Sequence, residues 1–578
     1  MTPSEIQQVD FTLQAVVPWA SADERRRNWP VVYVIDGAGE GGASSVYVGE
    51  TVNAEARMRQ HLASASKVGL RRVRVVMNER FNKSACLDLE SHLIRWLAGD
   101  GQYLVMNGNE GIIDARYYER ERYREEFREI FEQLRSEGVF HRTIPEIENS
   151  DLFKLSPFKV LTHEQAVAVE NIVEGLLEDF ASESGSSSSV IEGHPGTGKT
   201  IVGIFLMKLL ADIRDFDEAD EVEPDSMFAE FFVTENRDLL TDLRIGLVVP
   251  QQSLRESIKR VFKKTPKLSP SQVLTPFDVG LADQKWDILI VDETHRLNQR
   301  ANQSSGVNNR RFITANEKLF GWDDPTKTQL DWIRAQSTHQ VFLLDAGQTV
   351  RPADLPQATL RSLVADADRS HRKYPLMSQM RVRAGSDYVA FIRGLLSGVP
   401  RADSRPDFGE YDLRFFDDLA EMRREILRRE SEFKLARLVA GYAWEWKSRK
   451  DPAAFDIELD GLRLRWNSQD RDWINSPKSI HEVGSIHTVQ GYDLNFAGVI
   501  IGNDLRYDSR TGRLYVDRSS YFDAKGKENN KQLAIEYSDD DLLEFIRNIY
   551  GVLLTRGIRG TYVYVCDPEL RAFISRAL

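Results

Sequence analysis

The sequence predicts an α/β protein with two mostly parallel sheets, preceded by a smaller α+β unit. Three observations support this fold class. Residues 193–200 read GHPGTGKT and lie between a β-rich segment and an apolar helical one. Two apolar runs, 286–291 and 340–344, each lead directly into an aspartate. Buried parallel strands have apolar runs of this kind, and their carboxyl ends bring polar groups to one edge of the sheet.

The overall composition is that of a globular protein, with 41% hydrophobic and 29% charged residues. We expect no membrane segment, because no apolar run approaches the roughly 18 residues of a transmembrane helix. Cys86 and Cys566 lie far apart, which favours a reducing, cytoplasmic location. The net charge of −13 argues against general adhesion to nucleic acid but leaves room for local basic grooves.

The chain is long enough for roughly three or four domains. We expect a small N-terminal domain, a helical linker and two lobes, at residues 1–112, 113–157, 158–375 and 376–578. The linker alternates charges and carries the stripe Tyr123, Phe127, Ile130 and Leu134, which predicts a helix with one packed face. A spacer is favoured over a coiled coil. The acidic segment 212–230 is predicted to be a surface insertion.

The N-terminal domain alternates strand and helix signals. We expect strands at 31–35, 46–50 and 73–77, and helices at 54–63 and 83–97. Glu90 shares a helical face with Cys86, Leu93, Ile94 and Leu97. A carboxylate in an apolar stripe requires a partner or a metal. An ion pair with a nearby arginine is the plain alternative.

An ordered set of polar residues runs through this domain: Tyr33, Tyr47-Val48-Gly49, Arg57, His61, Glu90 and Asn107. The set resembles the GIY-YIG nuclease family. The resemblance implies that Glu90 holds Mg²⁺ or Mn²⁺, that Arg57 stabilises phosphorane-like charge, and that Tyr33 or Tyr47 activates water. It places His61 within the site and gives Asn107 an ordering role.

The sequence departs from the nuclease pattern at one point, because Val31-Val32 precedes Tyr33 where the family has Gly-Ile. A degenerate, binding-only module is therefore the alternative to an active nuclease.

The segment 193–200 matches the phosphate-binding P-loop pattern GxxxxGK[ST]. A strand leads into it and a helix leads out, so its backbone N–H groups can point at an anion. We expect Lys199 to reach the β- and γ-phosphates of ATP and Thr200 to hold Mg²⁺. The predicted phosphate-binding residues are Gly193, Gly196, Thr197, Gly198, Lys199 and Thr200.

Two carboxylates follow the first apolar run and match a Walker B motif. Asp292 is expected to hold Mg²⁺ through water, and Glu293 to orient the attacking water. After the second run, Gln348 lies where superfamily 1 enzymes keep a γ-phosphate-sensing glutamine. Upstream, Thr162 and Gln165 can form a helix capping box. The same tract resembles the Q-motif of these enzymes, in which Gln165 would read the adenine edge.

The second half resembles the later superfamily 1 motifs. Arg381, in the tract 379–383, corresponds to a γ-phosphate arginine, and residues 485–493 resemble a motif that contacts both strand backbone and nucleotide. Arg556, in the tract 552–560, is the favoured arginine finger, with Arg559 as its competitor. For any single arginine, a solvated surface charge is the plain alternative.

From about residue 158 to 578 the chain resembles the Schlafen-type DNA/RNA helicase domain of superfamily 1. The resemblance implies two RecA-like lobes and a helicase or translocase motor that uses ATP and Mg²⁺ and binds nucleic acid, with DNA favoured over RNA. Repair or anti-phage defence is the expected setting, and the sequence does not choose between them. Motifs of this kind indicate an NTPase and do not establish strand separation. An ATP-gated nuclease switch without translocation is the alternative.

Overall fold

The computed structural model describes residues 4–38, 44–64, 67–108, 117–182, 185–217, 227–301, 303, 305–379, 382, 385–398, 407–469, 473–489 and 492–577. The chain forms two compact units. The first contains Met1–Ser184, Ile201–Leu243 and Ser257–Gln272, and the second contains Gly185–Thr200, Arg244–Glu256 and Val273–Leu578.

The first unit is built on a five-stranded sheet in the order β1-β4-β2-β3-β5. Its neighbouring strands are antiparallel, except for the parallel pair β3 and β5. The strands are β1 (Glu5–Asp10), β2 (Val31–Ala38), β3 (Ser44–Thr51), β4 (Leu70–Met77) and β5 (Leu104–Val105). The β-branched run at the start of β2 fits a pleated strand, and its first six residues are all buried.

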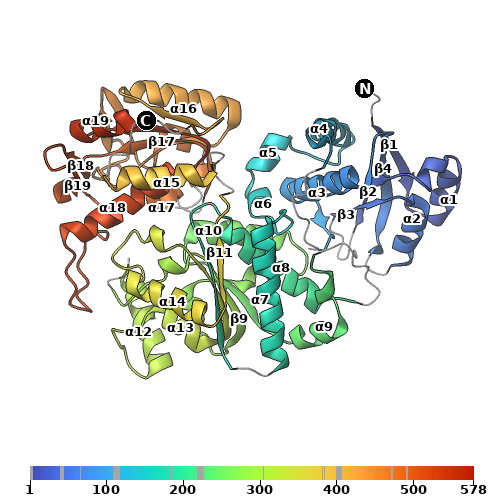
Figure 1. Cartoon of the computed structure of the whole chain (residues 1–578), viewed down its shortest axis with the longest axis horizontal. Coiled ribbons are helices and arrows are strands. Elements are labelled where there is room, and N and C mark those ends of the chain that lie inside the picture. The colour runs from blue at the N-terminus through green and yellow to red at the C-terminus, as the bar shows by residue number, and fades with distance from the viewer. Residues whose placement is uncertain are drawn as a thin grey trace. The chain divides into compact units, whose positions relative to one another are not determined.

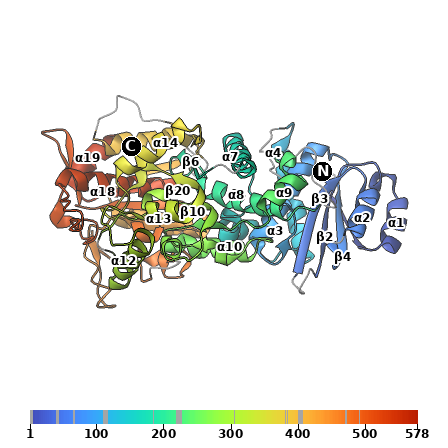
Figure 2. The same cartoon turned by 90° about the horizontal axis from the view of Figure 1, so that it is seen from below.

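Helices cover both faces of this sheet, as the two views show (Figures 1 and 2). Side chains alternate along a strand, so Val32 and Val34 pack with residues of α3 and α4. Tyr33 and Ile35 point the other way and pack with residues of α1 and α2. These helices are α1 (Leu13–Ser21), α2 (Ala54–Ala63), α3 (Lys83–Asp100) and α4 (Arg120–Ser136).

The predicted linker helix is α4, and its apolar stripe is buried. Phe127, Ile130 and Leu134 belong to the same hydrophobic cluster as α3. The stripe therefore has the packed face that the sequence predicts, and that face lies against the N-terminal module. The unit also contains α5 (Ile144–Asn149), α6 (Asp151–Lys154), α7 (His163–Ala181) and α9 (Thr234–Leu240). Most of α8 (Lys199–Arg214) and the second part of α10 (Gln252–Lys263) belong to it as well.

The expectation of a surface insertion at 212–230 is wrong at both ends of that segment. Asp212 lies in the last turns of α8, is 3% exposed and pairs with the equally buried Lys208. At the other end, Phe228 within the segment and Phe231 directly after it are buried. Two buried phenylalanine rings and a buried ion pair hold these ends in the fold. The acidic composition of the segment gives no sign of this packing. Residues 218–226 lie outside the described part of the chain.

The second unit contains two parallel sheets, which we call lobe 1 and lobe 2. Lobe 1 has six strands in the order β11-β6-β10-β9-β7-β8, and its neighbouring strands are parallel. Its strands are β6 (Ser187–Gly193), β7 (Ile245–Val248), β8 (Val273–Leu274), β9 (Trp286–Val291), β10 (Ser337–Leu344) and β11 (Lys373–Leu376). Its helices include α11 (Pro276–Gly280), α12 (Gly306–Phe320), α13 (Gln329–Gln336) and α14 (Gln357–Arg369).

Lobe 2 has five parallel strands in the order β12-β20-β17-β13-β16. They are β12 (Asp412–Phe415), β13 (Ala436–Ala440), β16 (Val483–Ser485), β17 (Leu494–Ile501) and β20 (Gly557–Val565). Antiparallel hairpins are formed by β14 (Ile457–Leu459) with β15 (Leu462–Leu464), and by β18 (Leu505–Asp508) with β19 (Arg513–Val516). The two parallel sheets confirm the α/β class.

Helices also cover both faces of the lobe 2 sheet (Figure 1). One hydrophobic cluster joins the sheet to α16, and another joins it to α15, α18 and α19. The helices of this lobe are α15 (Gly385–Leu396), α16 (Leu419–Phe433), α17 (Ile486–Val489), α18 (Asp539–Leu554) and α19 (Pro568–Ala577).

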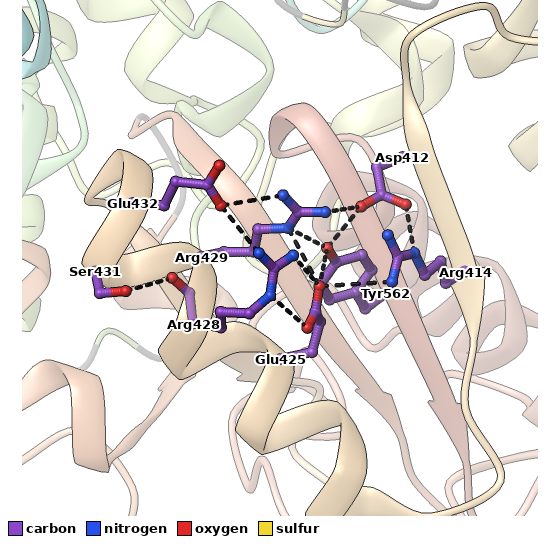
Figure 3. A network of polar contacts seen from close by, with 8 residues as sticks. All are labelled: Asp412, Arg414, Glu425, Arg428, Arg429, Ser431, Glu432 and Tyr562. Carbon is purple, nitrogen blue, oxygen red and sulfur yellow. Dashed lines mark hydrogen bonds and ion pairs between the residues drawn. The ribbon is translucent and has the colours of Figure 1, made fainter.

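A polar network fixes α16 to strands β12 and β20 (Figure 3). The buried Tyr562 hydroxyl donates to Asp412 at 2.7 Å and accepts from Arg429 Nε at 2.8 Å. Arg429 also pairs with Asp412, and Glu425 pairs with Arg414. Exposed ion pairs contribute little to stability on their own. Because the buried Tyr562 hydroxyl bonds to both Asp412 and Arg429, the network fixes the position of α16 on the sheet.

In the part of the chain that is described, no helix combines the length and the apolar character needed to cross a membrane.

Candidate functional site

The P-loop follows β6 and turns into α8, as the sequence predicts. Gly196 and Gly198 have φ angles of 86° and 81°, in the left-handed region that favours glycine. A Cβ atom at Gly193 would lie 2.5 Å from Thr197 Oγ1. These three glycines are therefore required for the turn and for its close packing.

Lys199 lies folded against the loop that it follows. Its Nζ donates to the carbonyl oxygens of Gly193 at 2.7 Å and His194 at 3.1 Å. Thr197 Oγ1 donates to the same His194 oxygen at 3.0 Å. Lys199 as a whole is 7% exposed. A positive charge and left-handed glycines at a helix start form a cradle suited to phosphate.

Thr200 and Asp292 meet although 92 residues separate them in the sequence. The hydroxyl of Thr200 donates to Asp292 Oδ2 at 2.9 Å. Asp292 follows β9, and burial together with the adjacent Glu293 carboxylate raises its pKa. Hydroxyl and carboxylate oxygens are the ligands that Mg²⁺ prefers, so these two residues fit the cation that a bound nucleotide would bring.

Glu293 adopts a left-handed conformation with φ 47°. One of its oxygens lies 2.9 Å from His295 Nε2, and His295 Nδ1 accepts from the backbone N–H of Asp345 at 3.4 Å. Burial favours a raised pKa for Glu293, but His295, Lys199 and Arg556 lower it overall. The carboxylate is thus held as an anion, and His295 connects it to the end of β10.

Gln348 lies in the short turn after β10. Its Nε2 donates to Asp345 Oδ2 at 2.7 Å, and the other oxygen of Asp345 accepts from Gly347 N at 3.0 Å. Gln348 is 3% exposed, and its buried Oε1 has no hydrogen-bond partner among the described residues. This amide is therefore rigidly placed while retaining an acceptor.

Two of the predicted arginines can be compared. Arg556 is 2% exposed and donates to the backbone oxygen of Tyr492 at 3.2 Å. Its charge contributes to the low pKa of Glu293, so a lobe 2 cation acts on a lobe 1 carboxylate. The guanidinium of Arg559 instead lies 4.8 Å from the centre of the Phe433 ring. Arg381 lies outside the described residues.

Sequence reasoning missed Arg393, which reaches the P-loop from α15. Its Nη1 lies 3.5 Å from His194 Nε2, and its Nη2 lies 3.9 Å from Asp345 Oδ1. Gln379 likewise donates to the backbone oxygen of Pro195 at 2.6 Å. An arginine on an amphipathic helix gives no local signal of such a role. Only the packing of lobe 2 against lobe 1 reveals it.

In the N-terminal module, four of the predicted residues lie together on the α2 face of the sheet. Tyr33 Oη lies 2.7 Å from His61 Nε2 and accepts from Arg57 Nε at 3.3 Å. The rings of Tyr33 and Tyr47 stack at 6.3 Å, and Tyr47 meets His61 edge-on at 5.0 Å. A Cβ atom at Gly49 would lie 2.1 Å from Tyr33 Oη, which explains the glycine.

A lysine absent from the predicted set completes this cluster. Lys67 Nζ lies 2.7 Å from His61 Nδ1 and 3.4 Å from the centre of the Tyr47 ring. Lysine can only donate, so His61 Nε2 carries the hydrogen and donates to Tyr33. Burial, Lys67 and Arg57 lower the pKa of His61 to about 3. The imidazole is therefore neutral at ordinary pH.

Glu90 lies on α3, and α3 packs against the opposite face of the sheet from the tyrosine cluster. It is 6% exposed. The carboxylates of Glu50 and Glu90 both help to raise the pKa of Cys86, after burial as the main cause, so the two acids share one neighbourhood. Glu50 directly follows Gly49 in β3, and successive side chains of a strand point to opposite faces. Among the described residues, no group of three or more His, Cys, Asp or Glu is arranged to hold a metal.

Asn107 bridges the end of the module to β3. Its Oδ1 accepts from Val48 N at 3.1 Å and its Nδ2 donates to Val48 O at 2.8 Å. This strand-like pairing fits an ordering role.

Gln165 forms the capping box that the sequence predicts. Its Oε1 accepts from Thr162 N at 3.0 Å, and its own N–H donates to Thr162 Oγ1 at 3.3 Å. The capping role therefore uses the side-chain oxygen of Gln165.

The fold and this site define a two-lobed P-loop protein. Residues 186–567 match the family model described as Schlafen group 3, DNA/RNA helicase domain, and the chain belongs to this family. The uncharacterized protein YPL245W of Saccharomyces cerevisiae is 26% identical over 415 residues, which cover 67% of this chain and 83% of the yeast protein. Residues 1–185 lie outside the family match.

A solved structure of the Pif1 helicase from Bacteroides, in complex with ADP-AlF3 and ssDNA, aligns with 72% of this chain and 96% of its own. The sequence identity is 9% and the TM-score is 0.25.

Proposed function

We propose that the chain is an ATP-dependent nucleic-acid motor of superfamily 1 type, joined to a metal-dependent GIY-YIG endonuclease. The observation that carries the motor is the 2.9 Å contact between Thr200 and Asp292. It joins the P-loop to a second strand end at one edge of the lobe 1 sheet, where ligands bind in such folds. Membership of the helicase family supports the same conclusion.

Each residue around this contact would have a separate role in ATP hydrolysis. The backbone of residues 196–198 would cradle the phosphates, and Lys199 would leave its carbonyl partners to meet the γ-phosphate. Thr200 and Asp292 would hold Mg²⁺, which neutralises charge on the phosphates. Glu293, held as an anion, would orient the attacking water.

The arginine that acts on Glu293 comes from the other lobe, which supports coupling of hydrolysis to lobe movement. Arg556 is favoured over Arg559 as the finger because Arg556 acts on Glu293 whereas Arg559 lies over Phe433. Asn548 of lobe 2 also donates to the backbone oxygen of Thr349 in lobe 1, at 2.8 Å. A nucleotide that changes these contacts shifts the equilibrium between lobe arrangements.

The N-terminal cluster supports acid–base chemistry on a phosphodiester. Tyr33 Oη accepts N–H hydrogen bonds from His61 and Arg57, so the oxygen anion formed when Tyr33 gives up its proton would be stabilised there. Arg57 would then stabilise charge on the phosphate. Glu90 would hold Mg²⁺ or Mn²⁺, with water filling the other positions, because Mg²⁺ retains much of its hydration.

Two alternatives remain in view. In the first, ATP gates the nuclease without movement along the strand. In the second, the N-terminal module recognises nucleic acid without cutting it, which the Val31-Val32 departure favours. DNA is proposed over RNA on family grounds, and repair or defence against phage is the proposed setting.

The motor is tested by ATP-driven displacement of a triplex-forming strand from DNA, with Glu293→Gln as the matched variant. Wild type is expected to displace the strand with ATP, whereas the variant should bind ATP without turnover and displace nothing. Nucleic-acid-stimulated ATPase activity without displacement would contradict translocation and favour the switch. No ATPase activity in wild type would contradict the motor altogether.

A further inference from the structure

An aromatic loop, residues 441–451, follows β13 at the carboxyl end of the lobe 2 sheet. It reads GYAWEWKSRKD. The side chains of Tyr442, Trp444 and Trp446 are half-buried. Carboxyl ends of parallel strands are where open α/β sheets bind ligands, so three aromatic rings at this edge call for an explanation.

The rings of the aromatic loop pack against the core on one side and are partly exposed to solvent. Tyr442 and Trp444 pack at 5.6 and 6.2 Å from the fully buried Trp466, and the Tyr442 and Trp446 rings lie 6.4 Å apart. Phe522 adds a fourth ring, 44% exposed, and its N–H donates to Tyr442 O at 2.7 Å. Core packing accounts for Trp466, but it leaves the exposed ring surfaces unexplained.

The loop is held rigidly. Both the N–H and the hydroxyl of Ser448 donate to the buried Asp456, at 2.7 and 2.6 Å. A Cβ atom at Gly502 would lie 2.1 Å from Ala443 Cβ, and one at Gly441 would lie 2.7 Å from Tyr550 Oη. A loop ordered in this way loses little conformational freedom when a ligand binds.

Cations are interleaved with the rings. Lys447, Arg449 and Lys450 are exposed, and the Arg449 guanidinium lies 5.5 Å from the centre of the Trp446 ring. The loop has three cations against the two carboxylates Glu445 and Asp451, in a chain whose net charge is −13. Rings and cations together are the features that bind single strands, through base stacking and phosphate attraction.

The aromatic loop also contacts His487, in the segment 485–493. The Tyr442 ring lies 5.3 Å from the His487 ring. His487 is the second residue of α17, and α17 directly follows β16. In the sheet, β16 pairs with β13. A nucleic-acid strand that lies along the aromatic loop would therefore also reach the segment around His487.

We propose that the aromatic loop, with Phe522, is a stacking platform for the bases of single-stranded nucleic acid. This inference rests on the proposed motor, because it assigns a place where that motor holds its strand. Trp446 and Phe522 provide ring faces for bases, and Lys447, Arg449 and Lys450 attract the phosphates. Because every base has a π face, the platform is expected to bind without strong sequence preference.

The test is a double-mutant cycle in which one partner is the strand. Anisotropy of labelled oligothymidylate is measured with the full chain, as wild type and as Trp446→Ala, and again with an oligomer of the same length that lacks bases. Trp446→Ala is expected to weaken binding of oligothymidylate about tenfold, since removing one stacking ring has an effect of this order. It should leave the abasic oligomer unchanged, and Trp446→Phe should restore most of the loss.

Trp322→Ala is the matched control, because Trp322 is 60% exposed on lobe 1, outside the loop. Oligouridylate in a parallel series distinguishes RNA from DNA as the strand. Equal losses for both oligomers, or no loss for either, would overturn the platform while leaving the motor intact. If wild type binds no single strand at all, with or without a non-hydrolysable ATP analogue, the proposed function fails first.

Discussion

The two sites of this chain are built on different kinds of sheet. In the lobes, the polar residues follow parallel strands, and Thr200 meets Asp292 across 92 residues at one edge. In the N-terminal module, the sheet is mainly antiparallel. Tyr33 packs on the α2 face, whereas Glu90 lies on α3, and α3 packs on the other face. Parallel topology gathers strand ends at one edge, so chain order predicts their meeting. An antiparallel sheet distributes side chains by register, which a sequence leaves open.

The largest expected effect concerns the P-loop. Lys199→Ala should lower ATP turnover by about 10²-fold or more, because it removes a γ-phosphate contact made in the transition state. Phosphate release measures this loss. Lys318→Ala is the matched control, since Lys318 pairs with the exposed Asp283. Unchanged turnover in Lys199→Ala would show that this loop is not the ATP site.

The next effect tests the antiparallel site. Tyr33→Phe removes the oxygen that contacts both His61 and Arg57, and cleavage of DNA should fall about 10²-fold, the size of a lost acid–base group. ATP turnover should be unchanged. Cutting is measured on plasmid DNA with Mg²⁺ or Mn²⁺. Tyr515→Phe, at a 43% exposed position, is the control. Full cutting by Tyr33→Phe would remove this tyrosine from the chemistry.

A smaller effect sharpens the contrast between sequence and packing. Arg393→Ala should lower ATP turnover about tenfold, because it removes a cation that lies beside His194 and Asp345 at the phosphate end of the site. Arg559→Ala, over the Phe433 ring, should change turnover by less than about twofold. The same phosphate-release assay compares them. The reverse order would make Arg559 the hydrolytic arginine.

The smallest effect is a pH dependence of the N-terminal module. The pKa of His61 is lowered from 6.5 to about 3 by burial and by Lys67 and Arg57, and its other ring neighbours are Tyr33 and Tyr47. As pH falls below 6.5, His61 is protonated in the unfolded state but stays neutral in the folded state. The free energy of unfolding therefore declines. From pH 7 to pH 5 the free energy of unfolding falls by about 2 kcal/mol.

Hydrogen exchange of β2 and α2, corrected for intrinsic rates, measures this decline. His61→Gln should flatten the pH dependence. An opening free energy that does not change between pH 7 and pH 5 in wild type would contradict a buried neutral His61.

The sequence predicts the parts of the fold that local patterns encode. The helix at residues 54–63 has the bounds of α2, and the apolar runs that end in Asp292 and Asp345 are adjacent parallel strands. The contact of Thr200 with Asp292 follows from the same logic. Their proposed roles in hydrolysis stay predictions.

Other features depend on contacts that no local pattern reveals. Arg393 lies near His194, 199 residues away in the sequence, and nothing in the sequence of α15 marks it. The charged composition of 212–230 hid the buried pair of Asp212 with Lys208. Lys67 joined the tyrosine cluster from outside the ordered motif. In each case long-range packing decides the environment, and the residue type alone does not.

One experiment tests most directly whether the two sites form one ATP-dependent machine. Cleavage of plasmid, single-stranded and forked DNA is measured with Mg²⁺ or Mn²⁺, with and without ATP, for wild type, Glu90→Ala and Lys199→Ala. We expect cutting that disappears in Glu90→Ala and whose response to ATP disappears in Lys199→Ala. Absence of cutting in all three proteins, while nucleic acid still stimulates ATP turnover, would contradict the coupled nuclease and leave a motor with a binding module.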